Sequence, residues 1–200
     1  MEETANVKAN KKIKTKDLVF VGVFVALYLA VMMVAVTILG FVPVLYLMAP
    51  FFVGIVCAPV YLVMAMRLKK PGPVLILSII MGLMFIGTAP TGTIWVVATG
   101  ILAEVVIALG KYTSKKHYLI SWVVFSLSTF GPYTSIVFTK QNYLDITLNY
   151  FGQEYTDALA ALLSNEAVAL VLVGAAVGGV IGALLSNKIL KKHFLNADLV

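Results

Sequence analysis

The chain of 200 residues is 61% hydrophobic, carries a net charge of +6 and has a mean hydropathy of +1.00. Soluble domains contain about 45–50% apolar residues, so this composition excludes an ordinary soluble protein. With membrane spans of about 20 residues each, little of the chain remains for a separate soluble domain. The single cysteine, Cys57, excludes a disulfide framework.

Fourteen of the fifteen Lys and Arg residues fall in four clusters that alternate with pairs of apolar runs, and only Lys140 lies outside them. The clusters occupy residues 8–16, 67–70, 111–116 and 188–192. Basic residues near span ends stay in the cytoplasm. The pattern therefore predicts an all-α integral membrane protein, a compact bundle of six transmembrane helices with both termini cytoplasmic. Charges placed at span ends indicate topology and contact with anionic headgroups, not nucleic-acid binding.

In chain order, we expect a basic cytoplasmic N-terminus (1–17), a six-helix membrane domain (18–187) and a cytoplasmic C-terminus (188–200). The spans are expected at about 18–39, 44–66, 72–87, 94–109, 118–139 and 160–187. The second span contains Pro50 and Pro59, which should kink it because proline lacks a backbone donor. The start of the sixth span has two alternatives, with Thr156 or Asn165 as its capping residue.

The segment 140–157 is the one long connection expected on the outer side. It carries three carboxylates, and its aromatic residues, with Phe138 at the rim, number five. One interpretation is a belt of aromatic side chains at the membrane interface. The other is a lid over an outward-facing pocket, because this segment is longer than a connection needs to be.

The sequence contains no pattern for ATP hydrolysis or metal binding. The Gly110-Lys111 pair is followed by Tyr112, and Val105 stands where a phosphate-binding loop needs its first glycine. His117 and His193 lie in basic clusters without a carboxylate at metal-binding spacing. We therefore expect no enzymatic activity, cofactor or metal in this chain.

Two carboxylates lie within the expected spans. A charge in the bilayer costs at least ~2.5–3.5 kcal/mol, so each must face protein, water or a ligand. Glu166, beside Asn165 near the outer end of the sixth span, is either a headgroup-level cap or a pocket residue. Glu104, near the middle of the fourth span, lies half a revolution from Trp95. It is expected either at the base of a cavity or paired with another span.

Aromatic and hydroxyl side chains gather near the outer ends of the fourth and fifth spans. Trp95 and Thr99 are four residues apart, so they point together. Pro132 leaves a carbonyl that a hydroxyl, water or ligand can use, and Tyr133 offers a ring for stacking. Hydroxyls in this region also commonly bond to their own helix. The predicted substrate-binding residues are Trp95, Thr99, Glu104, Tyr133, Asn165 and Glu166.

Small residues recur every fourth position in the first and sixth spans. Gly22, Ala26 and Ala30 lie in the first span, and residues 174, 178 and 182 of the sixth are glycines. Small residues in this register let two helix backbones approach closely. We assign the glycines of the sixth span to packing inside the bundle and the stripe of the first span to a partner helix.

Together these features resemble the substrate-binding S-component of energy-coupling factor (ECF) transporters. The likeness rests on the length, the six expected spans, the lead-in Lys14-Thr15-Lys16-Asp17-Leu18 and the Ala26-x-x-x-Ala30 pair. The stretch LVFVGVFVALY, residues 18–28, is most similar to the Trep_Strep, or MptD-type, branch. The resemblance implies that Ala26 and Ala30 dock on a transmembrane coupling subunit joined to two ATPase subunits. It also implies that a vitamin or related micronutrient binds near the outer surface.

The predicted function is therefore substrate capture for an ATP-driven importer in the bacterial cytoplasmic membrane, with no nucleic-acid partner. Two carboxylates and no cation within the spans favour a neutral or amine-bearing substrate over an anion. The alternative is an autonomous ion-coupled secondary transporter, with Glu104 as its proton or cation site. A lipid-modifying enzyme is disfavoured because no nucleophile–base pair is present, and a purely structural subunit would bind no small molecule.

Overall fold

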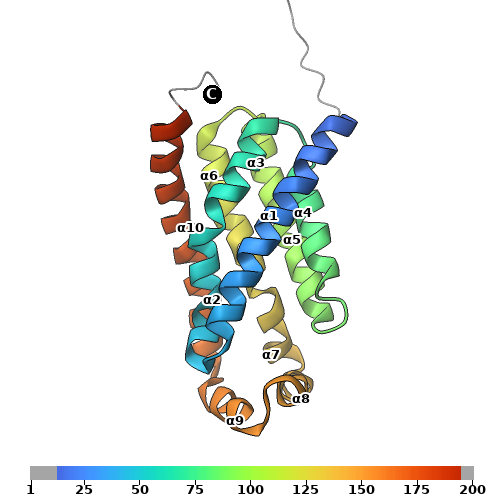
Figure 1. The fold of residues 1–200 in the computed structure, drawn as a ribbon, viewed down its shortest axis with the longest axis vertical. Helices are drawn as coiled ribbons and strands as arrows, with labels where there is room; N and C mark the ends of the chain where they lie inside the picture. The colour runs from blue at the N-terminus through green and yellow to red at the C-terminus, as the bar shows by residue number, and fades with distance from the viewer. Residues whose placement is uncertain (1–12, 195–200) are drawn as a thin grey trace, which may run out of the picture.

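The computed structural model describes residues 13–194, whose regular structure is helical. The helices along the bundle are α1 (Thr15–Gly40), α2 (Pro43–Val56), α3 (Ala58–Leu68), α4 (Pro73–Leu83), α5 (Pro90–Leu109), α6 (Lys115–Ser126) and α10 (Asn165–Phe194). A 3-10 segment, η1 (Leu127–Tyr133), and α7 (Thr134–Phe138) continue from α6. Two further helices, α8 (Lys140–Phe151) and α9 (Gln153–Leu162), close one end of the bundle (Figure 1).

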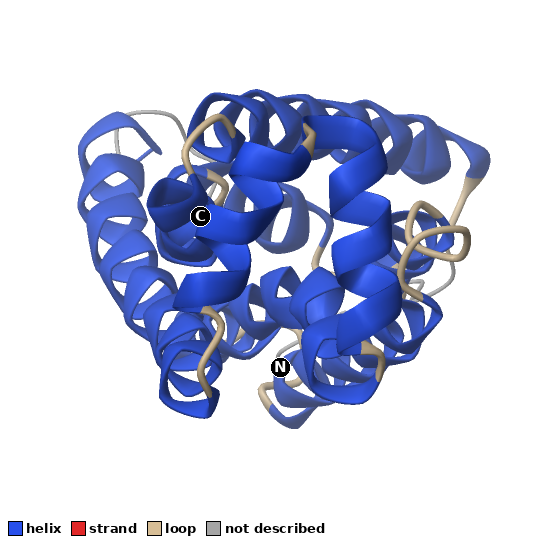
Figure 2. Ribbon diagram, turned by 90° about the horizontal axis from the view of Figure 1, so that it is seen from below, coloured by secondary structure: helices blue, strands red, loops and turns tan. Residues whose placement is uncertain are grey.

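The two ends of the bundle differ in charge. Both ends of the described chain lie at the same end of the bundle (Figure 1), which we call the basic end. It carries Lys14, Lys16, Arg67, Lys69, Lys70, Lys111, Lys115, Lys116, Lys188 and Lys191. The opposite end, closed by α8 and α9 and seen from below in Figure 2, is called the covered end. The cytoplasmic location of the basic end stays a prediction. The predicted basic residues Lys8, Lys11 and Lys12, and residues 195–200, lie outside the described residues.

Five segments of the described chain are long and apolar enough to cross a membrane: Thr15–Gly40, Pro43–Leu68, Pro90–Leu109, Lys115–Phe138 and Asn165–Lys191. The third expected span, 72–87, differs from these. Helix α4 has 11 residues, or about 16 Å at 1.5 Å per residue, and residues 84–88 form turns. A hydrocarbon core is about 30 Å thick, so α4 alone does not cross it. The count of six spans therefore stays a prediction.

Proline breaks the second span as expected. Pro50 lies inside α2, and the helix is interrupted at Cys57, two residues before Pro59. Pro50 has no N–H for the carbonyl of Tyr46, and the Tyr133 hydroxyl donates to that oxygen over 2.5 Å. Beside the interruption, Trp122 Nε1 donates to the Gly54 carbonyl over 3.2 Å. Side chains from the α6–η1 segment thus satisfy carbonyls on α2.

Helix α10 begins at Asn165, and the preceding Ser164 accepts a hydrogen bond from Ala167 N over 3.1 Å, as an N-cap does. The helix therefore starts close to the later of the two predicted positions, with Ser164 in place of Asn165 as the capping residue. Glycines bring α10 against α2, as assigned from the sequence. A Cβ on Gly54 would lie 2.8 Å from the backbone of Gly178, and a Cβ on Gly178 would collide with the Phe51 carbonyl.

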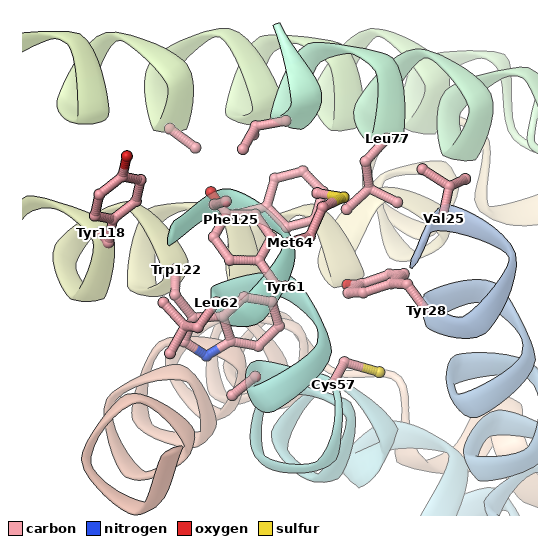
Figure 3. Close-up of a cluster of buried hydrophobic side chains, with 14 of the residues drawn as sticks. Val25, Tyr28, Cys57, Tyr61, Leu62, Met64, Leu77, Tyr118, Trp122 and Phe125 are labelled. Carbon is pink, nitrogen blue, oxygen red and sulfur yellow. The ribbon is translucent and has the colours of Figure 1, made fainter. Parts of the chain in front are cut away.

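The main core lies between α1, α3, α4, α5 and α6. Its centre is aromatic: the rings of Tyr61 and Phe125 stack at 5.0 Å, and Trp122 lies 5.0 Å from Tyr61 (Figure 3). These three side chains are almost fully buried. A second, smaller apolar cluster lies near the covered end, where α2, η1, α9 and α10 meet.

Candidate functional site

Six aromatic rings from five elements pack together near the covered end. This covered cluster consists of Tyr46 (α2), Trp95 (α5), Phe130 and Tyr133 (η1), Tyr143 (α8) and Tyr155 (α9). Trp95 meets Phe130 edge to face at 5.6 Å, Phe130 stacks on Tyr133 at 6.1 Å, and Tyr133 lies 5.1 Å from Tyr46. Aromatic pairs at these separations prefer such offset and edge-on arrangements.

The polar atoms of three of these rings bond to backbone carbonyls where a helix is irregular. Trp95 Nε1 donates to Leu127 O over 2.8 Å, at the start of the 3-10 segment. Tyr133 bonds to the carbonyl freed by Pro50, and Tyr155 donates to Gly40 O over 2.8 Å, at the end of α1. Each ring is therefore held at its polar edge, which leaves its faces for stacking.

Helices α8 and α9 form a cover over the cluster, defined as residues 140–162. Gly152, with φ of 80°, forms the turn between them. Lys140 Nζ donates to Leu163 O over 3.1 Å, so the two ends of the cover are joined. Burial raises the pKa of the Tyr155 phenol to about 12, and burial also raises the pKa of Tyr143. Both tyrosines therefore face inward.

The other aromatics of this region point outward. Tyr150 is 77% exposed, Phe138 is 71% exposed and Phe151 is 54% exposed. Exposed aromatic side chains at the end of a membrane bundle are typical of the interfacial belt. The two interpretations of segment 140–157 thus apply to different side chains: Tyr143 and Tyr155 roof the cluster, and Tyr150 and Phe151 form the outer surface.

Of the predicted site residues, Trp95 and Tyr133 lie together in the covered cluster. Thr99 lies one turn along α5, buried, and its hydroxyl donates to the carbonyls of Trp95 and Val96 over 3.0 and 2.9 Å. Asn165 and Glu166 are exposed at the start of α10. They lie at the covered end, outside the cluster.

Glu104 lies apart from the other predicted site residues, close to the basic end. Its Oε1 accepts hydrogen bonds from Gly72 N at 2.9 Å and from the Tyr112 hydroxyl at 3.1 Å. Gly72 precedes α4 and Tyr112 follows α5, so Glu104 joins two connections of the basic end. Glu104 thus pairs with two connections and not with a polar group on another span, and it does not lie at the base of the aromatic cluster.

Two members of the cluster were not singled out in the sequence. Tyr46 has a usable signal, because it stands four residues before Pro50 and its carbonyl therefore lacks a helical donor. Phe130 has no such signal, since its ring is brought to Trp95 by the bend at η1. Contacts between residues so far apart in the chain leave no mark in local sequence.

A cavity of about 90 Å³ lies beside the cluster, lined by residues of α1, α2, α4 and η1 that include Tyr46, Pro50 and Tyr133. Its other walls are mainly apolar and include Met32 and Met81. Pockets for drug-sized ligands usually measure about 300–1,000 Å³. A ligand of vitamin size therefore needs the cover or the neighbouring helices to move.

The chain matches a family model described as hypothetical bacterial integral membrane protein (Trep_Strep), over residues 15–196. The chain belongs to the Trep_Strep family. It is a bacterial integral membrane protein with several membrane-spanning helices, and the predicted membership of the Trep_Strep family is confirmed. The Trep_Strep match begins at the first residue of α1 and includes the covered cluster. No curated protein and no solved structure matches the chain.

Proposed function

We propose that this protein is the substrate-binding membrane subunit of an ECF-type ATP-driven importer, which captures a vitamin or related micronutrient from outside the cell. The observation that carries the proposal is the covered cluster: six packed rings, three of them held by a hydrogen bond at their polar edge, at the end of the bundle that α8 and α9 cover. Binding sites for small molecules are mainly apolar and aromatic, with a few fixed polar groups. ATP hydrolysis belongs to separate subunits in this proposal.

The cluster favours a neutral substrate with a planar ring. None of its six members is charged at neutral pH, and the nearest predicted carboxylates lie elsewhere: Glu104 near the basic end, Glu166 exposed on α10. Stacking on aromatic faces, supported by phenol hydroxyls, suits a flat heteroaromatic molecule. An amine-bearing substrate was expected because of the two carboxylates, but the cluster contains no carboxylate that could pair with an amine.

A stripe of small residues on α1 supports docking on a coupling subunit. Gly22, Ala26 and Ala30 are all exposed, and a Cβ on Gly22 would meet no atom within 4 Å in the part of the chain that is described. The buried positions of α1 are Val21, Val25, Tyr28, Met32 and Gly40. Small side chains on an exposed helix face allow close approach of another helix. The proposed partner is a transmembrane coupling subunit attached to two ATPase subunits.

Two tyrosines of α8 provide the test of the binding site. We expect a neutral, ring-containing micronutrient to bind the purified protein, identified by native mass spectrometry and measured by calorimetry. Tyr143→Ala, which removes a ring from the cluster, should weaken binding more than tenfold. Tyr150→Ala, on the exposed side of the same helix, should leave the dissociation constant unchanged. Equal dissociation constants for the two variants would show that the cover is not part of the binding site.

A second candidate function, ion-coupled transport by this chain alone, is favoured by the buried carboxylate of Glu104. It predicts uptake by the purified chain in vesicles that contain no ATP and carry an imposed ion gradient. The importer proposal predicts no uptake under these conditions until the coupling and ATPase subunits are added.

A further inference from the structure

Among the described residues, Glu104 is a buried carboxylate without a cationic partner. Its side chain is 7% exposed, and Oε2 has no hydrogen-bond partner among the described residues. The one ion pair found in residues 13–194 joins Lys70 to Asp17 at 2.6 Å and leaves Glu104 out. Gly72, which donates to Oε1, is the N-cap residue of α4. The hydrogen bond from the start of α4 therefore satisfies Oε1, whereas Oε2 has no hydrogen-bond partner among the described residues.

The hydroxyl groups around Glu104 have already used their protons. Ser121 donates to Ala103 O over 2.8 Å, so the 2.6 Å bond between Ser121 and Tyr61 must have Tyr61 as its donor. Tyr118 donates to the carbonyl of Tyr112 over 2.9 Å, and Tyr112 donates to Glu104. A phenol or alcohol carries a single proton. These oxygens therefore have only lone pairs left to offer.

The hydroxyls come from different parts of the fold and form hydrogen bonds at or beside Glu104. Tyr112, in the α5–α6 connection, contacts the carboxylate directly. Ser121 of α6 accepts from Tyr61 of α3 and donates to the carbonyl of Ala103, the residue before Glu104. At Tyr112, which lies between the spans, burial and then Glu104 raise the pKa to about 12. Figure 3 shows Tyr61 and Tyr118 in the same aromatic core. In the described part of the chain, the site thus offers oxygen acceptors and one negative charge, and these hydroxyls have no remaining proton to donate.

We propose that Glu104 is the charged ligand of an alkali-metal ion site near the basic end of the bundle. Hard cations take carboxylate, hydroxyl and carbonyl oxygens as ligands. One carboxylate balances one positive charge, whereas Ca²⁺ sites usually gather several carboxylates. A water molecule at this position would leave the buried negative charge without a counter-charge. A proton on Oε2 would neutralise the carboxylate but could form a hydrogen bond with only one of the neighbouring oxygens. A bound ion would strengthen the link that Glu104 of α5 makes with the start of α4 and with the α5–α6 connection.

The experiment measures thermal unfolding of the purified full chain in NaCl, KCl or N-methylglucamine chloride at one ionic strength. Sodium or potassium should raise the unfolding midpoint by on the order of 2–4 °C in a saturable way, because the ion binds only the folded chain. The organic cation is too large for a buried site and should give the lower midpoint. The two alkali salts distinguish which ion is preferred. Identical midpoints in all three salts overturn the proposal and indicate a water molecule or a proton at Oε2.

Variants locate the effect. Glu104→Gln should abolish the difference between the salts, and Glu154→Gln, at an exposed position on α9, should retain it. If Glu104→Gln does not fold, Tyr112→Phe keeps the ring but removes the hydroxyl oxygen that contacts Glu104 and should raise the half-saturating ion concentration severalfold. If Glu104→Gln keeps the full difference in unfolding midpoint between the salts, the ion binds elsewhere and the assignment is overturned. None of these measurements requires a substrate or partner subunit, so their outcome is independent of the proposed importer function.

Discussion

At the scale of single residues, aromatic donors compensate for irregular helices. Trp122, Trp95 and Tyr133 each donate to a carbonyl near a proline or a 3-10 turn. In a bilayer no water is available to satisfy such carbonyls, so side chains of neighbouring segments must do it. The same bonds fix the rings that form the covered cluster, so the irregular backbone and the candidate site have a common cause.

Tyr133→Phe tests this compensation. The variant keeps the ring but leaves the carbonyl of Tyr46 without a donor, which should cost about 1–3 kcal/mol of unfolding free energy. Thermal unfolding in detergent measures the change, with Tyr150→Phe as the control because that hydroxyl lies on the exposed side of α8. If both variants unfold at the same temperature, the hydrogen bond to Tyr46 contributes nothing to stability.

At the scale of helices, close approach between α2 and α10 depends on particular glycines. A Cβ on Gly178 would meet the backbone of Phe51, whereas a Cβ on Gly174 would lie 3.7 Å from the Phe51 side chain, an ordinary contact. Two glycines one turn apart on α10 thus differ in how much space surrounds them.

Gly178→Ala and Gly174→Ala form a matched pair. The first should destabilise the protein by about 1–3 kcal/mol, because an added methyl group in a tight contact forces backbone shifts. The second should be neutral or slightly stabilising, since alanine favours a helix more than glycine does. Unfolding midpoints of the two variants provide the comparison, and equal losses would contradict the packing of α2 on α10.

The exposed stripe of α1 leads to a prediction about assembly. Ala26→Leu and Ala30→Leu add bulk at positions that face away from the bundle, so the fold and ligand binding should remain intact. Copurification with a coupling subunit should be lost, because the helices can no longer approach closely. Val180→Leu, at an exposed position on α10, should assemble normally. Loss of ligand binding together with assembly would indicate misfolding instead.

At the scale of the whole molecule, the distribution of charge predicts its orientation. Both described chain ends and ten of the described Lys and Arg side chains lie at the basic end, and Lys140 lies at the cover. Basic residues favour the cytoplasmic side of a membrane. The cover and the aromatic cluster beneath it are therefore expected to face away from the cytoplasm.

Cysteine labelling tests this orientation. The native Cys57 is buried, so engineered cysteines can be read with little background. A membrane-impermeant maleimide should label Glu154→Cys in intact cells and should label Lys115→Cys only after the membrane is opened. The reverse result would place the cover, the cluster and the α1 stripe in the wrong orientation for an importer.

Local sequence was enough to predict the membrane class, the basic clusters, the proline break in the second span and the position of Trp95 and Tyr133 near one end. Each of these follows from a local property, because a bilayer requires about 20 apolar residues per span and proline removes a particular donor. The tertiary structure alone decided that α4 ends at Leu83 and that Glu104 joins connections at the basic end. It also decided that Tyr46 and Tyr155 complete the cluster. These features depend on contacts such as that between Tyr155 and Gly40, 115 residues apart, and hydropathy along the chain does not record which segments lie side by side.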